Sequence, residues 1–287
     1  MIDLHVHSTA SDGTLTPEEL AEKGRHLAVM ALTDHDNTDG CRRFLDACVS
    51  LGVQGLRLPG IELSIDPGKG YGRFHLLGLG IDPAAPCLVD FLDRIRAGRA
   101  ARNVQILDRL AELGMPVTEE EVRRYANGPI IARPHIARVL VEKRHAKDVK
   151  DAFARYLGEG APAYVERFRP SQEESIAVIH AAHGAAVMAH PRFWSADRVM
   201  LQEGFARLKG LGLDGVESVY QANEPLETPM HRRLAQACGL AETAGSDFHG
   251  VNKPTVTLGM AVENEDEAAF LRPLMEALAR QGCPFVR

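Results

Sequence analysis

The sequence predicts an α/β fold whose largely parallel sheet closes into a barrel. Short apolar segments recur along the 287 residues, and each ends in polar residues. Helix-like stretches separate most of these segments, and about seven such units suit a closed or distorted barrel. In barrels of this kind the catalytic side chains lie at the C-terminal ends of the strands.

The expected strands and helices follow one another along the chain. The strands are expected at 2–6, 28–33, 56–63, 74–80, 185–191, 213–220 and 240–246. Thr16 followed by Pro17 predicts a helix start, because Thr caps helices and Pro suits the first helical position. Further helices are expected from Ser171 to Gly184 and near 225–238.

One region interrupts the alternation. From 99 to 162 the sequence predicts helix after helix and no strand, in segments such as "ARNVQILDRLAELG" and "RPHIARVLVEKR". We therefore expect a barrel in two parts, 1–98 and 163–287, with a small all-helical insertion at 99–162. The insertion either only packs on the barrel or serves as a lid and substrate domain.

Composition narrows the class of protein. The chain is 45% hydrophobic and 25% charged, as soluble globular proteins are, and its net charge of -6 argues mildly against a broad nucleic-acid surface. It shows no signal peptide and no apolar run long enough for a membrane span. The five cysteines form no CxxC pair. We expect a cytoplasmic protein that does not engage a membrane.

Metal-ligand side chains recur at the expected strand ends. They are His5, His7, Asp12, His35, Glu62, His75, His190, Asp247 and His249. Each alone has an ordinary explanation: two histidines one residue apart arise by chance, Asp12 could shape a turn, and His75 could be a hydrogen-bonded core residue. Alternate residues of a strand point the same way, however, so such pairs can reach one metal.

The joint pattern favours one shared site. Mixed imidazole and carboxylate ligands suit zinc, manganese or iron. Nine ligands exceed the needs of one ion, so two or three ions are expected, with Glu62 as a natural bridge. Three divalent ions would outweigh the three carboxylates, and the resulting positive charge suits a phosphate.

The segments "DLHVHSTASDGT", "ALTDHD", "PGIELS", "FHLLGLG", "MAHP" and "GSDFHG" resemble, in order, the motifs of the PHP (polymerase and histidinol phosphatase) family of metal-dependent phosphoesterases. The resemblance implies a distorted seven-stranded β/α barrel with a trinuclear metal site. It implies one metal on His5, His7, Glu62 and Asp247, a second on Glu62, His75 and His190, and a third on Asp12, His35 and His249. Manganese is the expected ion, with zinc or iron as alternatives.

The resemblance also implies a reaction. The helical insertion resembles that of a subgroup acting on small phosphorylated compounds such as nucleoside 3',5'-bisphosphates. We expect hydrolysis of a phosphate monoester by a metal-bridging hydroxide, with Asp12, His35 and Glu62 as catalytic residues. The alternatives are an exoribonuclease acting on short RNA and a histidinol-phosphate phosphatase. A catalytically inactive binding module is disfavoured because the ligand set is intact.

Three further residues are candidates for substrate binding. Arg133 and His135 stand at the start of a predicted helix, where backbone N–H groups and a guanidinium bind anions well. Arg192 directly follows the "AHP" segment. The alternative for each is a structural contact such as a surface ion pair. Asp3, Asp34 and Asp36 adjoin ligands and are expected to orient the histidines, either by contacting them or by shaping turns, and not to bind metal directly.

Overall fold

The computed structural model describes residues 1–126, 131–262 and 266–286. The chain divides into two compact units, one of Met1–Phe91 with Pro170–Arg287 and one of Leu92–Arg169. The second unit thus begins and ends outside the expected bounds of 99 and 162. Its start falls within a long continuous helix, so the sequence offers no break there.

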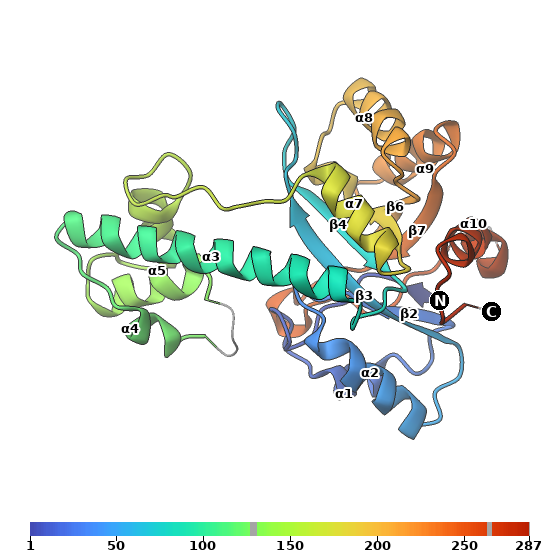
Figure 1. Cartoon of the computed structure of the whole chain (residues 1–287), viewed down its shortest axis with the longest axis horizontal. Coiled ribbons are helices and arrows are strands. Elements are labelled where there is room, and N and C mark those ends of the chain that lie inside the picture. Colours follow the sequence, from blue (N-terminus) through green and yellow to red (C-terminus); the bar gives the residue numbers. More distant parts are fainter. Residues whose placement is uncertain (127–130, 263–265, 287) are drawn as a thin grey trace. The chain divides into compact units, whose positions relative to one another are not determined.

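The first unit contains a sheet whose described residues form seven strands, in the order β1 to β7 (Figure 1). The strands are β1 (Ile2–Asp3), β2 (Val29–Leu32), β3 (Leu56–Ile65), β4 (Phe74–Leu79), β5 (Ala185–Met188), β6 (Gly215–Tyr220) and β7 (Ala241–Gly245). A backbone hydrogen bond from Leu4 N to Ala244 O (3.0 Å) links the two ends of the sheet. The sheet is therefore nearly closed, and the predicted distorted barrel is confirmed.

Strand β4 is the exception to the parallel arrangement. It runs antiparallel to both β3 and β5, while the other neighbouring pairs are parallel. The start of β4 therefore lies at the edge where the parallel strands end. This reversal brings His75, the second residue of β4, to the same end of the barrel as residues that follow the other strands.

Helices surround the barrel in the first unit (Figure 1). They are α1 (Pro17–Lys23), α2 (Asp39–Ser50), α7 (Gln172–Ala181), α8 (Arg198–Gly210), α9 (Glu227–Ala237) and α10 (Glu267–Arg280), with short 3₁₀ turns at Pro191–Phe193 and Gly250–Asn252. Thr16 caps α1 in a reciprocal capping box with Glu19, and Ser171 caps α7. Both predicted helix starts are confirmed.

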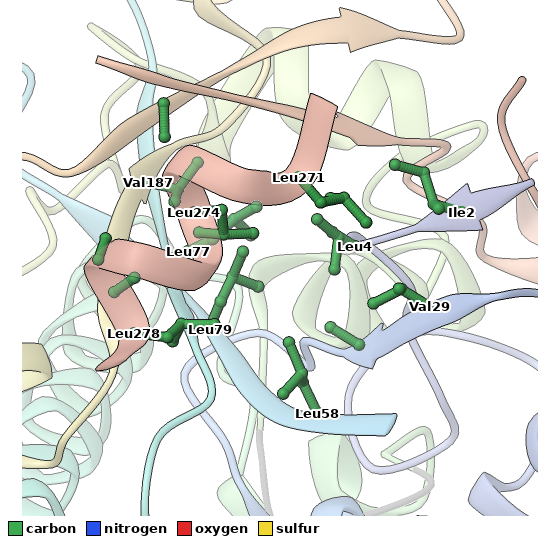
Figure 2. Close-up of a cluster of buried hydrophobic side chains, with 14 of the residues drawn as sticks. Ile2, Leu4, Val29, Leu58, Leu77, Leu79, Val187, Leu271, Leu274 and Leu278 are labelled. Atoms are coloured by element: carbon green, nitrogen blue, oxygen red, sulfur yellow. The ribbon is translucent and has the colours of Figure 1, made fainter. Parts of the chain in front are cut away.

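Helix α10 covers the end of the barrel where the parallel strands begin. Figure 2 shows its Leu274 and Leu278 beside Leu77 and Leu79 of β4, and its Leu271 beside Leu4. These side chains are almost fully buried. Because this end is filled by hydrocarbon, polar side chains gather at the opposite end.

The regular elements among the described residues of the second unit are all helices, as predicted. Helix α3 (Pro86–Glu112) enters it from the first unit, and α4 (Glu119–Arg123), α5 (Arg133–Glu142), α6 (Val149–Ala152) and a π-helical turn at Phe153–Leu157 follow. The unit has its own apolar core, centred on Ile106, Leu110, Ile136 and Leu140. No helix in the described residues combines the length and apolar character of a membrane span.

Candidate metal centre

The barrel positions all nine predicted ligand residues at one end. His5 and His7 follow β1, and Asp12 lies in the next loop. His35 follows β2, Glu62 lies in β3, His75 is the second residue of β4, His190 follows β5, and Asp247 and His249 follow β7. We call these nine residues the cage. Parallel strands end at a common edge, and the reversed β4 starts there, so residues far apart in the sequence meet.

The cage divides into four overlapping groups. Within each group, one potential ligand atom per residue lies within 4.8 Å of the others; the groups are His7, Asp12, His35 and His249; His5, Glu62 and His190; His5, His7 and Asp247; and His35, Glu62 and His75. Every predicted ligand belongs to at least one group. The grouping overlaps with the three expected sets but does not reproduce them, because His35 lies beside Glu62 as well as Asp12.

Glu62 is at the centre of the cage. Its Oε1 atom lies 2.7 Å from His75 Nδ1 and 3.0 Å from His190 Nε2. Its Oε2 atom lies 2.8 Å from His35 Nδ1, and 3.2 Å from Nε2 of both His5 and His7. The two oxygens therefore face different histidines, which is the arrangement that a bridging carboxylate requires.

The carboxylates of the cage are held in the ionised state. Burial alone would raise the pKa of Glu62, but His35, His5 and His75 hold it well below 4.5. Burial likewise opposes ionisation of Asp247, yet His5 and His7 hold its pKa well below the usual range. These groups thus offer negatively charged oxygen ligands at neutral pH.

The imidazoles differ in their environments. Burial would lower the pKa of His5, but Glu217, Glu62 and Asp247 raise it well above 6.5. Burial would also lower the pKa of His7, which nearby Asp247 and Glu62 raise to about 9. Burial lowers the pKa of His75 to about 4. Such divergent values within one cluster are characteristic of a functional site.

The chemistry of the donor atoms fits divalent metal ions. Six buried cage atoms have no hydrogen-bond partner among the described residues: His5 Nε2, His7 Nδ1 and Nε2, His35 Nδ1, Glu62 Oε2 and His190 Nδ1. Orphaned buried polar atoms are costly unless they bind something. Two cage residues, His190 (φ 28°) and Asp247 (φ 59°), also have left-handed backbone conformations that side chains disfavour.

The aspartates that adjoin the ligands form hydrogen bonds with backbone N–H groups and loop serines. Asp3 accepts hydrogen bonds from the backbone N–H groups of His5 (3.3 Å) and Ser246 (2.9 Å). Asp34 binds Ser8 and Ser11 of the loop after His7. Asp36 accepts from the Ser64 N–H. Asp3 thus holds the backbone at His5, and Asp34 holds the loop after His7, as a turn residue does. That these aspartates orient the histidines stays a prediction.

Three residues contact the cage although the sequence did not predict that they would do so. Tyr220 Oη donates to Asp247 Oδ2 (3.1 Å), and Lys253 Nζ lies 2.5 Å from the same oxygen. Glu217 contacts His5 and His190. The available signal for Glu217 was a lone charged residue inside the apolar segment "GVESVY".

The three candidate substrate residues have structural contacts of their own. Arg192 follows His190 and lies 3.4 Å from Glu227. Arg133 donates to Leu157 O (3.1 Å), and its guanidinium lies over the ring of Tyr164. His135 Nδ1 accepts from the N–H of Ala132, which caps α5. Arg133 and His135 belong to the second compact unit, whereas Arg192 belongs to the first.

Comparison with known proteins agrees with this geometry. The PHP domain family profile matches residues 3–166. A 3',5'-nucleoside bisphosphate phosphatase from Chromobacterium violaceum is 35% identical over 96% of this chain and 96% of its own length. The 5'-3' exoribonuclease Rnm of Salmonella typhimurium is 35% identical over 86% of this chain and 84% of its own length.

A solved structure shares the fold. A protein of Bifidobacterium adolescentis, assigned as a metal-dependent phosphoesterase, superposes with a TM-score of 0.76. The two sequences are 30% identical, and the superposition covers 96% of each chain. The similarity thus includes both the barrel and the helical unit.

Proposed function

The chain belongs to the PHP family of metal-dependent phosphoesterases, and from that premise we propose that it hydrolyses a phosphate monoester of a nucleoside 3',5'-bisphosphate. The observation that carries the proposal is the cage, in which six imidazoles and three carboxylates, Glu62 among them, lie in overlapping groups of potential ligands. The bisphosphate phosphatase that matches nearly the whole chain supports the choice of substrate.

We propose that the cage holds two or three divalent ions, manganese first and zinc or iron as alternatives. All nine cage residues would serve as ligands, and Glu62 would be suited to shared coordination because its two oxygens face different histidines. Bound ions would act as Lewis acids and would lower the pKa of a bound water molecule toward neutrality. The protein contributes fixed ligand geometry and a site that is largely shielded from solvent.

Residues of the cage have separate tasks in the proposal. Asp12 is the most exposed carboxylate, lies 3.2 Å from His249 Nε2 and is suited to a ligand at the open side of the site. His35 is partly exposed and lies 2.8 Å from Glu62, so it links that open side to the buried centre. We assign these three carboxylate and imidazole groups, Asp12, His35 and Glu62, to the reacting centre.

We propose, as the sequence predicts, that Arg133, His135 and Arg192 bind a non-reacting phosphate of the substrate. The second unit concentrates positive charge near Arg133. Arg102 there is 5% exposed, and burial together with Arg99, Arg133 and Arg167 lowers its pKa to about 10. A cluster of guanidinium groups of this kind attracts phosphate.

A second candidate is 5'-3' exoribonuclease activity on short RNA. It is favoured by the similarity to Rnm, which extends over most of both chains, and by the same basic cluster. Histidinol-phosphate phosphatase activity stays an alternative that rests on the sequence alone. The cytoplasmic location likewise stays a prediction from the sequence.

A phosphate-release screen of the manganese-loaded protein tests the proposal. The panel contains a nucleoside 3',5'-bisphosphate, mononucleotides, histidinol phosphate and short 5'-phosphorylated RNA. We expect the highest kcat/KM on the bisphosphate. Preferential release of mononucleotides from RNA would favour the exoribonuclease instead, and the absence of hydrolysis across the panel would contradict both.

A further inference from the structure

We propose that Glu217, which is not among the nine ligands, is a positioning residue that fixes His5 and His190 for metal binding. The inference rests on the proposed metal centre and adds a residue to it. Glu217 lies in β6, between β5 and β7 in the sheet, and its side chain is fully buried.

Both carboxylate oxygens of Glu217 contact cage residues. Oε1 lies 2.9 Å from His5 Nδ1, and Oε2 accepts a hydrogen bond from the backbone N–H of His190 (2.7 Å). On their other side, the Nε2 atoms of the same two histidines face the two different oxygens of Glu62. Glu217 and Glu62 therefore hold the pair from opposite sides, so Glu217 sets the spacing between two ligands.

The contact also selects the tautomer of His5. The carboxylate oxygen that faces Nδ1 accepts a hydrogen bond from it, which favours the form of His5 that carries its proton on Nδ1. The lone pair of Nε2 is then directed into the cage, where a metal ligand is needed. For His190 the contact is with the backbone, at a residue whose φ of 28° is strained and therefore needs an anchor.

The surrounding sheet is adapted to this carboxylate. The register between β6 and β7 shifts between Glu217 and Val219, and such bulges redirect side chains beside active sites. On β7, a Cβ atom at Gly245 would lie 2.3 Å from Glu217 Oε1 and 2.4 Å from His5 Cβ. Only glycine leaves room for the Glu217–His5 contact at that position.

Substitution by glutamine separates positioning from simple filling of space. If the amide nitrogen faces His5, it donates to Nδ1 and favours the tautomer of His5 that carries its proton on Nε2. In that tautomer Nε2 cannot bind a metal. If the amide nitrogen faces His190 instead, two N–H donors oppose each other. Either orientation disturbs one ligand while the side chain keeps its size.

The test measures metal binding by the full-length chain, stripped with chelator and titrated with Mn²⁺ against a competing indicator. We expect Glu217→Gln to weaken metal affinity about 10- to 100-fold, as loss of a hydrogen-bond partner to a metal ligand typically does. The visible absorption spectrum of Co²⁺-loaded protein should change in parallel. The free energy of unfolding of the metal-free variant shows separately whether the substitution disturbs the fold.

Glu242→Gln is the matched control. Glu242 is a buried carboxylate on β7 that binds Arg232 (2.7 Å) and Ser218 (2.9 Å) and has no recorded contact with the cage. It should lose stability yet keep metal affinity within about twofold. Equal affinities for the wild type, Glu217→Gln and Glu242→Gln would overturn the inference, whereas a wild type that binds no ion would overturn the proposed metal centre itself.

Gly245→Ala tests the same contact without removing the carboxylate. We expect it to weaken metal affinity as Glu217→Gln does. The double variant should bind metal no less tightly than the single variant with the lower affinity, because both substitutions act through one contact. If Glu217→Gln fails to fold, Gly245→Ala decides alone. Unchanged metal affinity in a folded Gly245→Ala protein would then contradict the inference.

Discussion

Glu62 is the residue on which the cage depends most, because five histidines face its two oxygens. Glu62→Gln keeps the volume but removes the charge and one acceptor. We expect loss of bound metal and a fall in kcat/KM of at least about a hundredfold, with the fold retained. Elemental analysis and phosphate release measure the two effects. A variant that hydrolyses at the wild-type rate would show that Glu62 is structural.

Arg133 tests substrate choice at the same scale. A charged hydrogen bond to a non-reacting phosphate contributes roughly 1.5–3 kcal/mol, or about ten- to a hundredfold in kcat/KM. We expect Arg133→Ala to lose that factor on a nucleoside 3',5'-bisphosphate but much less on an aryl phosphate. Arg138→Ala, an exposed arginine of the same helix, is the control. Equal losses on both substrates would mean that Arg133 does not grip a second phosphate.

The sequence could identify the candidate ligand residues that the fold brings together, but not the residues that hold them in place. Some candidate ligands can be recognised by their chemical type and by their one-residue spacing at the ends of apolar segments, as in His5 with His7 and Asp247 with His249. Glu217 has no such spacing, and its role depends on β6 lying beside both β5 and β7. A single glutamate in a strand becomes informative only when its partners are known.

At the scale of elements, capping chemistry is local and could be predicted, whereas strand direction could not. Thr16 and Ser171 bond to N–H groups three residues away, so the sequence alone carries the signal. The direction of β4 depends on a hairpin from β3, and the eight residues of the connection at 66–73 do not reveal it. The apolar pattern of Phe74–Leu79 is the same in either direction.

Helix α9 provides a pH test through His231. This residue is fully buried, neither ring nitrogen has a hydrogen-bond partner among the described residues, and burial followed by Arg192 lowers its pKa to about 4. The unfolded chain, with a pKa near 6.5, binds the proton more tightly. Stability is therefore complete above pH 6.5 and is lost as the pH falls toward 4.

We expect His231→Leu to remove that loss. Between pH 7 and pH 4.5 the wild type should lose roughly 2–3 kcal/mol more stability than the variant. Denaturant unfolding of both proteins in chelator at several pH values measures the difference. Substitution of the exposed His26 by Gln should leave the pH dependence unchanged. Parallel pH profiles for wild type and His231→Leu would contradict this account.

At the scale of the whole molecule, alternation of strands and helices indicated the barrel, and the run of helices indicated an insertion. Its bounds could not be read because α3 continues without interruption from Pro86 to Glu112 across the boundary at Leu92. The second unit has a separate apolar core around Ile106 and Ile136. An insertion with its own core can vary while the barrel keeps the cage intact, which is consistent with relatives that are named for different substrates.

The central claim, that the cage is a site for several metal ions, is tested most directly by counting the ions. The chain is stripped with chelator, reloaded with Mn²⁺, desalted and analysed for metal per chain, with Glu62→Gln treated in parallel. We predict two to three ions in the wild type, fewer in the variant, and no hydrolysis by the stripped protein until metal is restored. No more than one ion per chain after loading, or full hydrolytic activity in the presence of chelator, would contradict the claim.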